Sequence, residues 1–537
     1  MASQIAPQSR RISQLHSAII GARPVPQGFP AGAVDRAAPT NERIDRKALG
    51  IEMHASTILA IPTYRLREVG EAVARYDENL RRNGHSVPIV VFDDSTISAR
   101  DRYFSALEQT QTTNDLFYVG PEEKARFLQM ILGRIDDRRL ESIVRHLFRP
   151  SYGGNRNFTL IYSLGQLLVS ADDDMRPEAL MTYGTESLGD REICRGFLRK
   201  ASERSFKSRA FDVVGAFEEV LGRPVADVPD GYARGEVIID SATELETNAS
   251  KGLHRENTLL ISPGPLPESA VVKVAQTFRS GTNDIDAVDF IEMFLTNETQ
   301  GATEQLPELY VLSNFRPAVT KNNWRFDCGV AGYDNTNGLP PFFPTRLRFE
   351  DYIFRLWIQQ EGLAAAHVGA AQHHVRSNYM RSMLAADMFN EEICNLMKRK
   401  LRSHPYELRE LTVRFEYEGE VTAADTNEII DRVRGLHARV GAAARAGDGV
   451  RASALAGLEE DLYRSFYGLE PDFFHQNVAR IVDDVISVFR SALELWPTLV
   501  EMCFLEKRRH GLPMVRVKNR SQSYRGDSIL RLATRTP

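Results

Sequence analysis

The strongest constraint on the fold is an apolar run without polar alternation, VPIVVFDD, at residues 87–94. A strand covered on both faces has this composition, because neither of its two rows of side chains meets water. An earlier segment, STILAIPTY at 56–64, has the same character, and residues 66–82 between the two carry apolar side chains at helical spacing. Asn83 and Gly84 follow this pattern, as is typical of a helix C-terminus. Strand, helix and strand at this spacing predict a parallel βαβ unit and an α/β fold.

Polar and acidic residues follow the predicted strands at their carboxyl ends. Thr63 ends the first strand, Asp93 and Asp94 end the second, and three aspartates, Asp172–Asp174, end a further apolar strand within residues 166–174. In open α/β sheets, ligands bind outside the carboxyl ends of the strands. We therefore expect these side chains to converge on one binding cleft.

The aspartate triplet is compatible with few kinds of site. An EF-hand numbered from Asp172 needs glycine where Pro177 stands and glutamate where Tyr183 stands, and an aspartyl-phosphate phosphatase needs threonine where Arg176 stands. A solvated acidic turn is the alternative for an isolated triplet, but this triplet ends a buried strand. A divalent cation shared with a nucleotide diphosphate is the remaining explanation. In an extended segment, Asp172 and Asp174 would face the same side.

Four segments of the chain occur in an order that is informative. They are AIPTYRL, VVFDDST, GGNRNFTLIYSLGQLLVSADDD and RFEDYIFRLWIQQEG. In this order they resemble the family 2 glycosyltransferases of the GT-A fold, and the resemblance covers roughly residues 56–180 and 310–380. It implies an α/β fold with a Rossmann-like, mostly parallel sheet flanked by helices. The helical pattern of the last part of the chain adds a helical C-terminal region.

The resemblance also implies roles for individual residues. The positions that match nucleotide-sugar-binding residues are Pro62, Thr63, Asp93, Asp94, Arg156, Asp172 and Asp173. The positions that match metal ligands, for Mn²⁺ or Mg²⁺, are Asp172, Asp174, His373 and His374. The catalytic pair is Glu350 and Asp351, with Asp351 as the general base that takes the proton of an acceptor hydroxyl.

The length of 537 residues allows two or three structural units. We expect a poorly ordered leader at 1–50, a GT-A domain at 51–380 with an insertion at about 185–310, a helical region at 381–515 and a flexible tail at 516–537. The 67 basic and 72 acidic residues give a net charge of −5, which argues against nucleic-acid binding. No apolar run is long enough for a transmembrane segment. The expected location is cytoplasmic, with peripheral membrane association left open.

The resemblance implies a nucleotide-sugar-dependent hexosyltransferase. The expected donor is a nucleoside diphosphate sugar, with a UDP-sugar as the first candidate. The expected acceptor is a hydroxyl group of a saccharide or another molecule. The transfer is expected to invert the anomeric carbon. One alternative is a nucleotidyltransferase of related fold, although the glycine-rich loop that such enzymes place after the first strand is replaced by PTYRLRE. A second alternative is a non-catalytic scaffold that binds nucleotide sugars or polysaccharides.

Overall fold

The computed structural model describes most of the chain after the leader. The described residues are 56–182, 188, 192–200, 206–239, 259–262, 266–278, 287–296, 309–320, 328–343, 350–351, 353–354, 363–374, 384–403, 415–417 and 419–517. All of them fall in one compact unit. The predicted leader at 1–50, and the predicted tail beyond Val517, lie outside the described residues.

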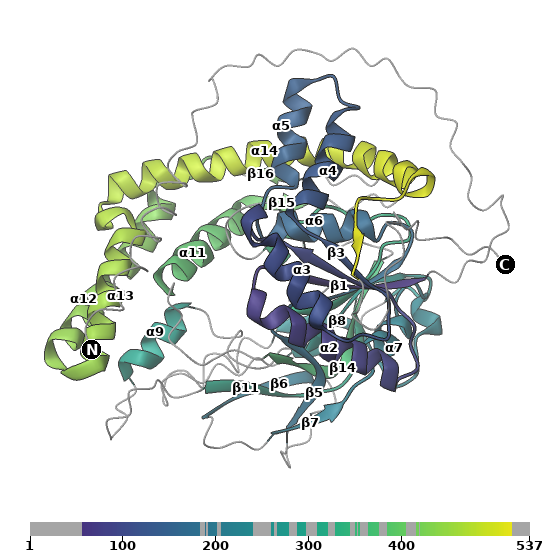
Figure 1. The fold of residues 1–537 in the computed structure, drawn as a ribbon. Helices are drawn as coiled ribbons and strands as arrows, with labels where there is room; N and C mark the ends of the chain where they lie inside the picture. Colours follow the sequence, from purple (N-terminus) through teal and green to yellow (C-terminus); the bar gives the residue numbers. More distant parts are fainter. Residues whose placement is uncertain are drawn as a thin grey trace. The chain divides into compact units, whose positions relative to one another are not determined.

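Strands and helices alternate in the first part of the chain (Figure 1). The elements up to the aspartate triplet are β1 (Thr57–Thr63), α2 (Leu66–Arg82), β2 (Ile89–Asp93), a 3-10 turn (Ile97–Ala99), α3 (Arg100–Gln109), β3 (Leu116–Val119), α4 (Pro121–Leu132), α5 (Arg138–Leu147), α6 (Tyr152–Tyr162) and β4 (Leu167–Ala171). The helix predicted at 66–82 is confirmed.

The middle of the chain is mainly strands. Its elements are β5 (Met175–Thr182), β6 (Glu192–Lys200), β7 (Phe206–Ala210), α7 (Val213–Glu218), a 3-10 turn (Val225–Asp227), β8 (Ala233–Ile239), β9 (Leu259–Ser262), β10 (Val271–Phe278), α9 (Ala287–Thr296), β11 (Leu309–Phe315), β12 (Ala318–Thr320), β13 (Val330–Asp334) and β14 (Leu363–His374). Strands of the predicted insertion therefore extend the main sheet.

The last part is helical. Its elements are α11 (Leu384–Lys400), β15 (Leu401–Ser403), β16 (Phe415–Tyr417), α12 (Ala423–Ala446), α13 (Gly449–Ser465), a 3-10 turn (Tyr467–Leu469), α14 (Pro471–Arg509) and β17 (Val515–Arg516). Among the described helices, none combines the length and the apolar character needed to cross a lipid bilayer.

The main sheet is mixed. Its strands follow the order β11-β6-β9-β8-β12-β14-β10-β13-β4-β1-β2-β3-β17, with β5 attached to β14 and β7 to β5. The pairs β4–β1, β1–β2 and β2–β3 are parallel, so the carboxyl ends of these strands lie at one edge. The pairs β10–β14 and β8–β12 are also parallel, and the other pairs in this sheet are antiparallel. The α/β class, with flanking helices and a helical C-terminal region, is confirmed.

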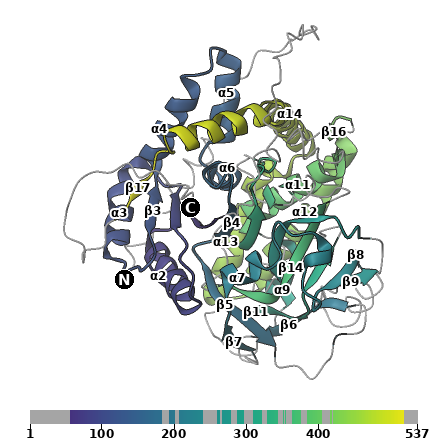
Figure 2. The ribbon, with the colours of Figure 1, turned by 90° about the vertical axis from the view of Figure 1, so that its right-hand side faces the viewer.

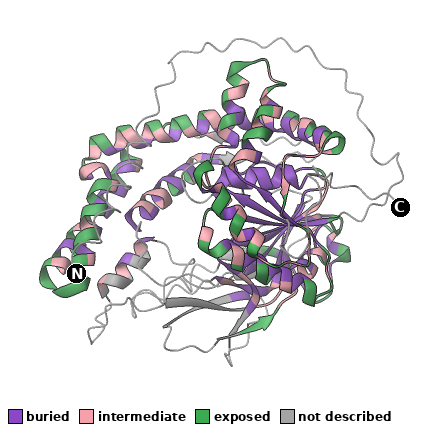
Figure 3. Ribbon diagram, viewed as in Figure 1, coloured by how far each residue is buried: buried purple, intermediate pink, exposed green. Residues whose placement is uncertain are grey.

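Two apolar cores cover the two faces of the parallel strands. In β1, Ile58 and Ala60 belong to one core, whereas Leu59 and Ile61 belong to the other. Successive side chains of a strand point to opposite faces, so both rows must be apolar, as the sequence of β2 indicated. Figure 3 shows these strands as buried and the outer faces of the surrounding helices as exposed.

The C-terminal region packs against the half of the sheet that contains the parallel strands β1, β2 and β3. Helix α14 packs against α5 and α6, as Figure 2 also shows. The indole Nε1 of Trp496 in α14 donates a hydrogen bond to the carbonyl of Leu339 at 2.7 Å. Strand β17 pairs with β3, with Val515 opposite Tyr118. The helical region and the sheet therefore share one core in the part of the chain that the structure describes.

Candidate active site

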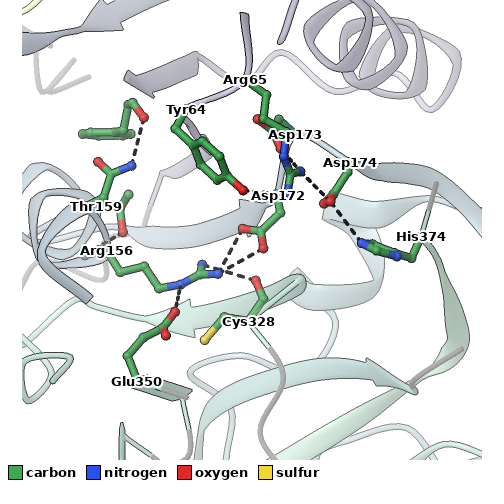
Figure 4. Close-up of polar contacts among 12 residues, drawn as sticks. Tyr64, Arg65, Arg156, Thr159, Asp172, Asp173, Asp174, Cys328, Glu350 and His374 are labelled. Carbon is green, nitrogen blue, oxygen red and sulfur yellow. Dashed lines mark hydrogen bonds and ion pairs between the residues drawn. The ribbon is translucent and has the colours of Figure 1, made fainter. Parts of the chain in front are cut away.

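The site lies at the carboxyl edge of β4, β1 and β2, where the sequence predicted it. Strand β1 is paired with both β2 and β4, so the residues after each strand are neighbours. Figure 4 shows Arg65, Arg156 and the three aspartates together with Glu350 and His374. The segments that meet here are as far apart in sequence as Thr63 and His374.

The aspartate triplet forms a turn between β4 and β5. The amide of Asp172 donates to the carbonyl of Gly329 at 2.9 Å, and the amide of Met175 donates back to the carbonyl of Asp172 at 3.0 Å. Asp173 and Asp174 both contact Arg65, whereas Asp172 contacts Arg156. Asp172 and Asp174 therefore have different arginine partners, and the alternation of an extended chain does not apply inside a turn. Their joint role as metal ligands stays a prediction.

The outer part of the site is organised by Arg65. Its Nη1 lies 2.7 Å from Asp173 Oδ1 and 2.5 Å from Asp174 Oδ2. Burial raises the pKa of Asp173 to about 6, although Arg65 and the hydroxyl of Thr63 act in the opposite direction. The side chain of Arg65 is 24% exposed, whereas those of Asp173 and Asp174 are only 3% and 8% exposed.

The inner part of the site is organised by Arg156 in α6. Its Nη2 donates to both carboxylate oxygens of Asp172 at 3.0 and 3.2 Å, its Nε donates to Glu350 Oε1 at 3.1 Å, and its Nη1 donates to the carbonyl of Cys328 at 3.3 Å. Burial raises the pKa of Asp172 to about 8 despite the neighbouring guanidinium. The resemblance implied that Arg156 binds the nucleotide sugar, whereas in the structure all three of its nitrogens donate hydrogen bonds to protein oxygens.

Local sequence explains the position of Arg156. Ser151 caps α6 by accepting a hydrogen bond from the amide of Gly154 at 3.0 Å. A Cβ added at Gly154 would lie 2.0 Å from the carbonyl oxygen of Arg149, so glycine is needed for this close approach. The helix thereby begins close to the sheet edge and directs Arg156 toward Asp172.

Asp93 and Asp94 have different surroundings. The carboxylate of Asp93 is fully buried and accepts hydrogen bonds from Ser95 and from the hydroxyl of Tyr118 at 2.7 Å. The side chain of Asp94 is 15% exposed and pairs with Lys124 Nζ at 3.0 Å. Asp93 therefore fixes the turn after β2, and Asp94 is the member of the pair that is nearer to solvent.

Pro62 and Thr63 end β1. Pro62 is opposite Phe92 in the sheet and is partly buried. The hydroxyl of Thr63 donates to Asp173 Oδ2 at 2.5 Å and accepts from the amide of Arg65 at 3.1 Å. Thr63 thus orients the aspartate triplet.

The catalytic pair predicted at Glu350 and Asp351 lies beside Arg156. Glu350 is buried and forms the ion pair with Arg156 already described. Asp351 is partly exposed, next to it in the same helical segment. Arg156 therefore links Glu350 to Asp172 across 178 positions of sequence.

The two histidines at the end of β14 face different partners. His374 Nε2 lies 3.1 Å from Asp174 Oδ2, and the His374 side chain is only 2% exposed. His373 Nδ1 lies 3.3 Å from Glu178 Oε2 in β5. Adjacent residues of a strand point to opposite faces, so only His374 joins the aspartate triplet.

The residues present fit a divalent cation with few protein ligands. In the described parts of the chain, no group of three or more His, Cys, Asp and Glu side chains is arranged to hold a metal ion. The 3.1 Å between Asp174 Oδ2 and His374 Nε2 is close to the separation of about 3 Å expected for two adjacent ligands of an octahedral ion. Mg²⁺ commonly uses one or two carboxylates and completes its shell with phosphate oxygens and water. An imidazole ligand suits Mn²⁺ better.

Several site residues were not predicted from sequence. Lys124 Nζ donates to Asn155 Oδ1 at 2.7 Å as well as to Asp94, and Asn155 Nδ2 donates to the carbonyl of Phe92 at 3.0 Å. Tyr64 is 53% exposed and stands between the two arginines. Nothing in the spacing of Lys124 signals its role, because its contacts are to other elements, whereas Tyr64 directly follows Thr63.

Comparison with known proteins gives little further information. No family model matches the sequence, and no curated protein matches it. A mannosyltransferase, PcManGT from Pyrobaculum calidifontis, solved in complex with GDP-Man and Mn²⁺, aligns with 82% of this chain and 88% of its own at 12% identity and a TM-score of 0.26. A likeness at this level assigns neither family nor ligand, so the function is argued from the site itself.

Proposed function

We propose that the chain is a glycosyltransferase of the GT-A type that moves a hexose from a nucleoside diphosphate sugar to an acceptor hydroxyl. The observation that carries this proposal is the network joining Glu350, Arg156 and Asp172 on the inner side to Arg65, Asp174 and His374 on the outer side. It supports the proposal because an acidic pair and a candidate metal position then lie together at the carboxyl edge of parallel strands. The catalytic unit of the proposal is 51–380, with the insertion at about 185–310.

The donor lies at the carboxyl edge of the sheet in this proposal. Asp93 is enclosed by Ser95 and Tyr118, so it does not contact the nucleoside in this proposal. The nucleoside contacts Asp94, which is partly exposed, and the exposed ring of Tyr64 instead. A divalent cation would neutralise the negative charge that develops on the diphosphate leaving group. Asp174 and His374 would hold it, and His373 has no role in this proposal.

Asp351 acts as the general base. As the acceptor oxygen attacks the anomeric carbon, the bond to the diphosphate breaks, and the acceptor proton passes to the Asp351 carboxylate. Attack from the side opposite the leaving group inverts the anomeric centre. Glu350 is held by Arg156, and this ion pair fixes the helical segment that carries Asp351.

The test is release of nucleoside diphosphate from a panel of UDP- and GDP-sugars with candidate saccharide acceptors and Mn²⁺ or Mg²⁺. We expect Asp351→Asn to lower the rate by about 10²- to 10⁴-fold, as for loss of a general base, with unchanged affinity for the nucleoside diphosphate. Asp484→Asn, at an exposed position of α14, removes the same charge and is the matched control.

Other results would contradict this function. Full activity of Asp351→Asn would remove Asp351 as the base. Release of pyrophosphate from a nucleoside triphosphate would favour nucleotidyl transfer. Binding of nucleotide sugar or polysaccharide without turnover of any donor would favour a non-catalytic scaffold.

A further inference from the structure

Arg65 occupies the position where the proposed function requires a metal ion. Its Nη1 contacts Asp174 Oδ2, the same oxygen that His374 Nε2 approaches. This oxygen therefore already has two partners, one cationic. A metal ion bound there would lie next to the guanidinium, and two cations so close repel each other.

The side chain of Arg65 is enclosed less completely than that of Arg156. It belongs to the short connection between β1 and α2, and it is 24% exposed. Its second contact surface is Tyr64, whose ring centre is 4.9 Å from the guanidinium carbon and whose hydroxyl accepts from Nη2 at 3.2 Å. Tyr64 is itself largely exposed. Arg156, by contrast, is enclosed and engaged on every nitrogen.

The local charge balance favours an exchange. Four carboxylates, those of Asp172, Asp173, Asp174 and Glu350, share this network with the two guanidiniums of Arg65 and Arg156. The carboxylates outnumber the guanidiniums, and buried carboxylates are stabilised by pairing with cations. A divalent cation can supply positive charge in place of Arg65, which can then pair with another anion.

We propose that Arg65 is an exchangeable counter-ion of the aspartate triplet: it pairs with Asp174 as long as no divalent cation is bound, yields this carboxylate to such a cation, and then binds the diphosphate of the donor. The inference rests on the proposed function, because it takes the metal and the diphosphate from there. A guanidinium binds phosphate oxygens through paired hydrogen bonds, and the diphosphate would approach the metal from the open side where Arg65 lies. Arg65 is thus a positioning residue for the metal and a contact for the donor.

This role predicts opposite effects on two ligands. Without Arg65, Mn²⁺ no longer competes with a guanidinium for Asp174. Arg65→Gln should therefore bind Mn²⁺ alone about tenfold more tightly than the wild type does. The same variant should bind UDP or GDP in the presence of saturating Mn²⁺ about tenfold more weakly, the effect of losing one charge-assisted contact. A merely structural role would weaken both or change neither.

The experiment is titration of the full-length chain with Mn²⁺, followed by the electron paramagnetic resonance signal of free Mn²⁺, and calorimetric titration with UDP and GDP. Arg67→Gln is the matched control, because Arg67 is exposed two positions further along and removal of its charge should leave both affinities unchanged. Arg65→Lys is the second variant. It keeps the positive charge but lacks the planar guanidinium that can donate two parallel hydrogen bonds. The affinity for Mn²⁺ should therefore stay near the wild-type value while the affinity for the nucleoside diphosphate falls.

The outcomes separate the inference from the proposed function. If the wild type binds Mn²⁺ and a nucleoside diphosphate but Arg65→Gln binds Mn²⁺ no more tightly, the exchange is wrong and the proposed function stands. If Arg65→Gln and Arg67→Gln shift Mn²⁺ affinity equally, the shift comes from the lower net charge of the protein and not from Arg65 itself. The exchange would then also be wrong. If no form binds Mn²⁺ and nucleoside diphosphate, the metal-dependent function fails and the inference fails with it.

Discussion

The inner and outer sides of the site use the same chemistry in different surroundings. On the inner side, Arg156 is buried and its three nitrogens contact Asp172, Glu350 and a backbone carbonyl. On the outer side, Arg65 is partly exposed and contacts Asp173 and Asp174 from a short connection. A buried ion pair cannot lose one partner without leaving an uncompensated charge, whereas an exposed pair can exchange partners with water or ions. The inner side is therefore the more fixed of the two, and we expect ligands to bind at the outer side.

The largest expected effect tests this difference directly. Arg156→Met should lower the free energy of unfolding by about 3 to 5 kcal/mol, because Asp172 and Glu350 lose their buried partner. Arg65→Met should lower it by less, about 1 to 3 kcal/mol, because Arg65 is partly exposed although Asp173 and Asp174 are buried. Urea denaturation of both variants measures the two values. Equal losses in the two variants would remove the distinction between a fixed and an exchangeable arginine.

The second prediction concerns what holds the inner side in place. Lys507 of α14 donates from Nζ to the carbonyls of Tyr162 and Leu164 and to Gln166 Oε1, at 2.6 to 2.9 Å, just after the C-terminus of α6. Burial lowers the pKa of Lys507 to about 7 from its ordinary 10.5. Between these pH values the unfolded chain binds more protons than the folded one, so this residue makes stability rise with pH, by up to about 1.4 kcal/mol per pH unit.

Lys507→Met should remove this contribution. The difference in unfolding free energy between wild type and Lys507→Met should therefore increase from pH 7 toward pH 10, as measured by urea denaturation at several pH values. Arg509→Met, at an exposed position two residues further on, is the control and should show no such slope. A constant difference would mean that Lys507 keeps its charge in the folded protein, as its three acceptor oxygens would favour.

The sequence predicted the elements that depend on local pattern. The helix at 66–82 has an apolar stripe and a clear C-terminal signal, and the structure places it at Leu66–Arg82. Local sequence also explains the boundary between α4 and α5. Gly133 ends α4, and Asp137 caps α5 by accepting from the amides of Arg139 and Leu140.

The contacts of the site were harder to predict because they depend on tertiary pairing. The convergence of Thr63, Asp94 and Asp172 followed from strand order alone. The separation of His373 from His374 depends on the pairing of β14 with β5, where His373 is opposite Arg176. The role of Arg65 depends on the turn of the triplet, which the sequence analysis treated as extended. Local spacing cannot reveal a contact between residues 109 positions apart, as Arg65 and Asp174 are.

The smallest expected effect tests the contribution of Trp496 to the inner side. Trp496→Phe keeps most of the apolar contact with Phe148 but removes the Nε1 donor to the carbonyl of Leu339, so we expect a loss of about 1 to 2 kcal/mol in unfolding free energy. Tyr463→Phe, which changes an exposed ring of α13, should have no measurable effect. If α14 stabilises the inner side, the amides of α6 should also exchange faster with solvent in Trp496→Phe, while the connection that carries Arg65 should be unchanged. Faster amide exchange both in α6 and in the connection that carries Arg65 would show that the two sides of the site are not independent. Unchanged exchange in α6 would show that contacts within α6 are enough to hold Arg156.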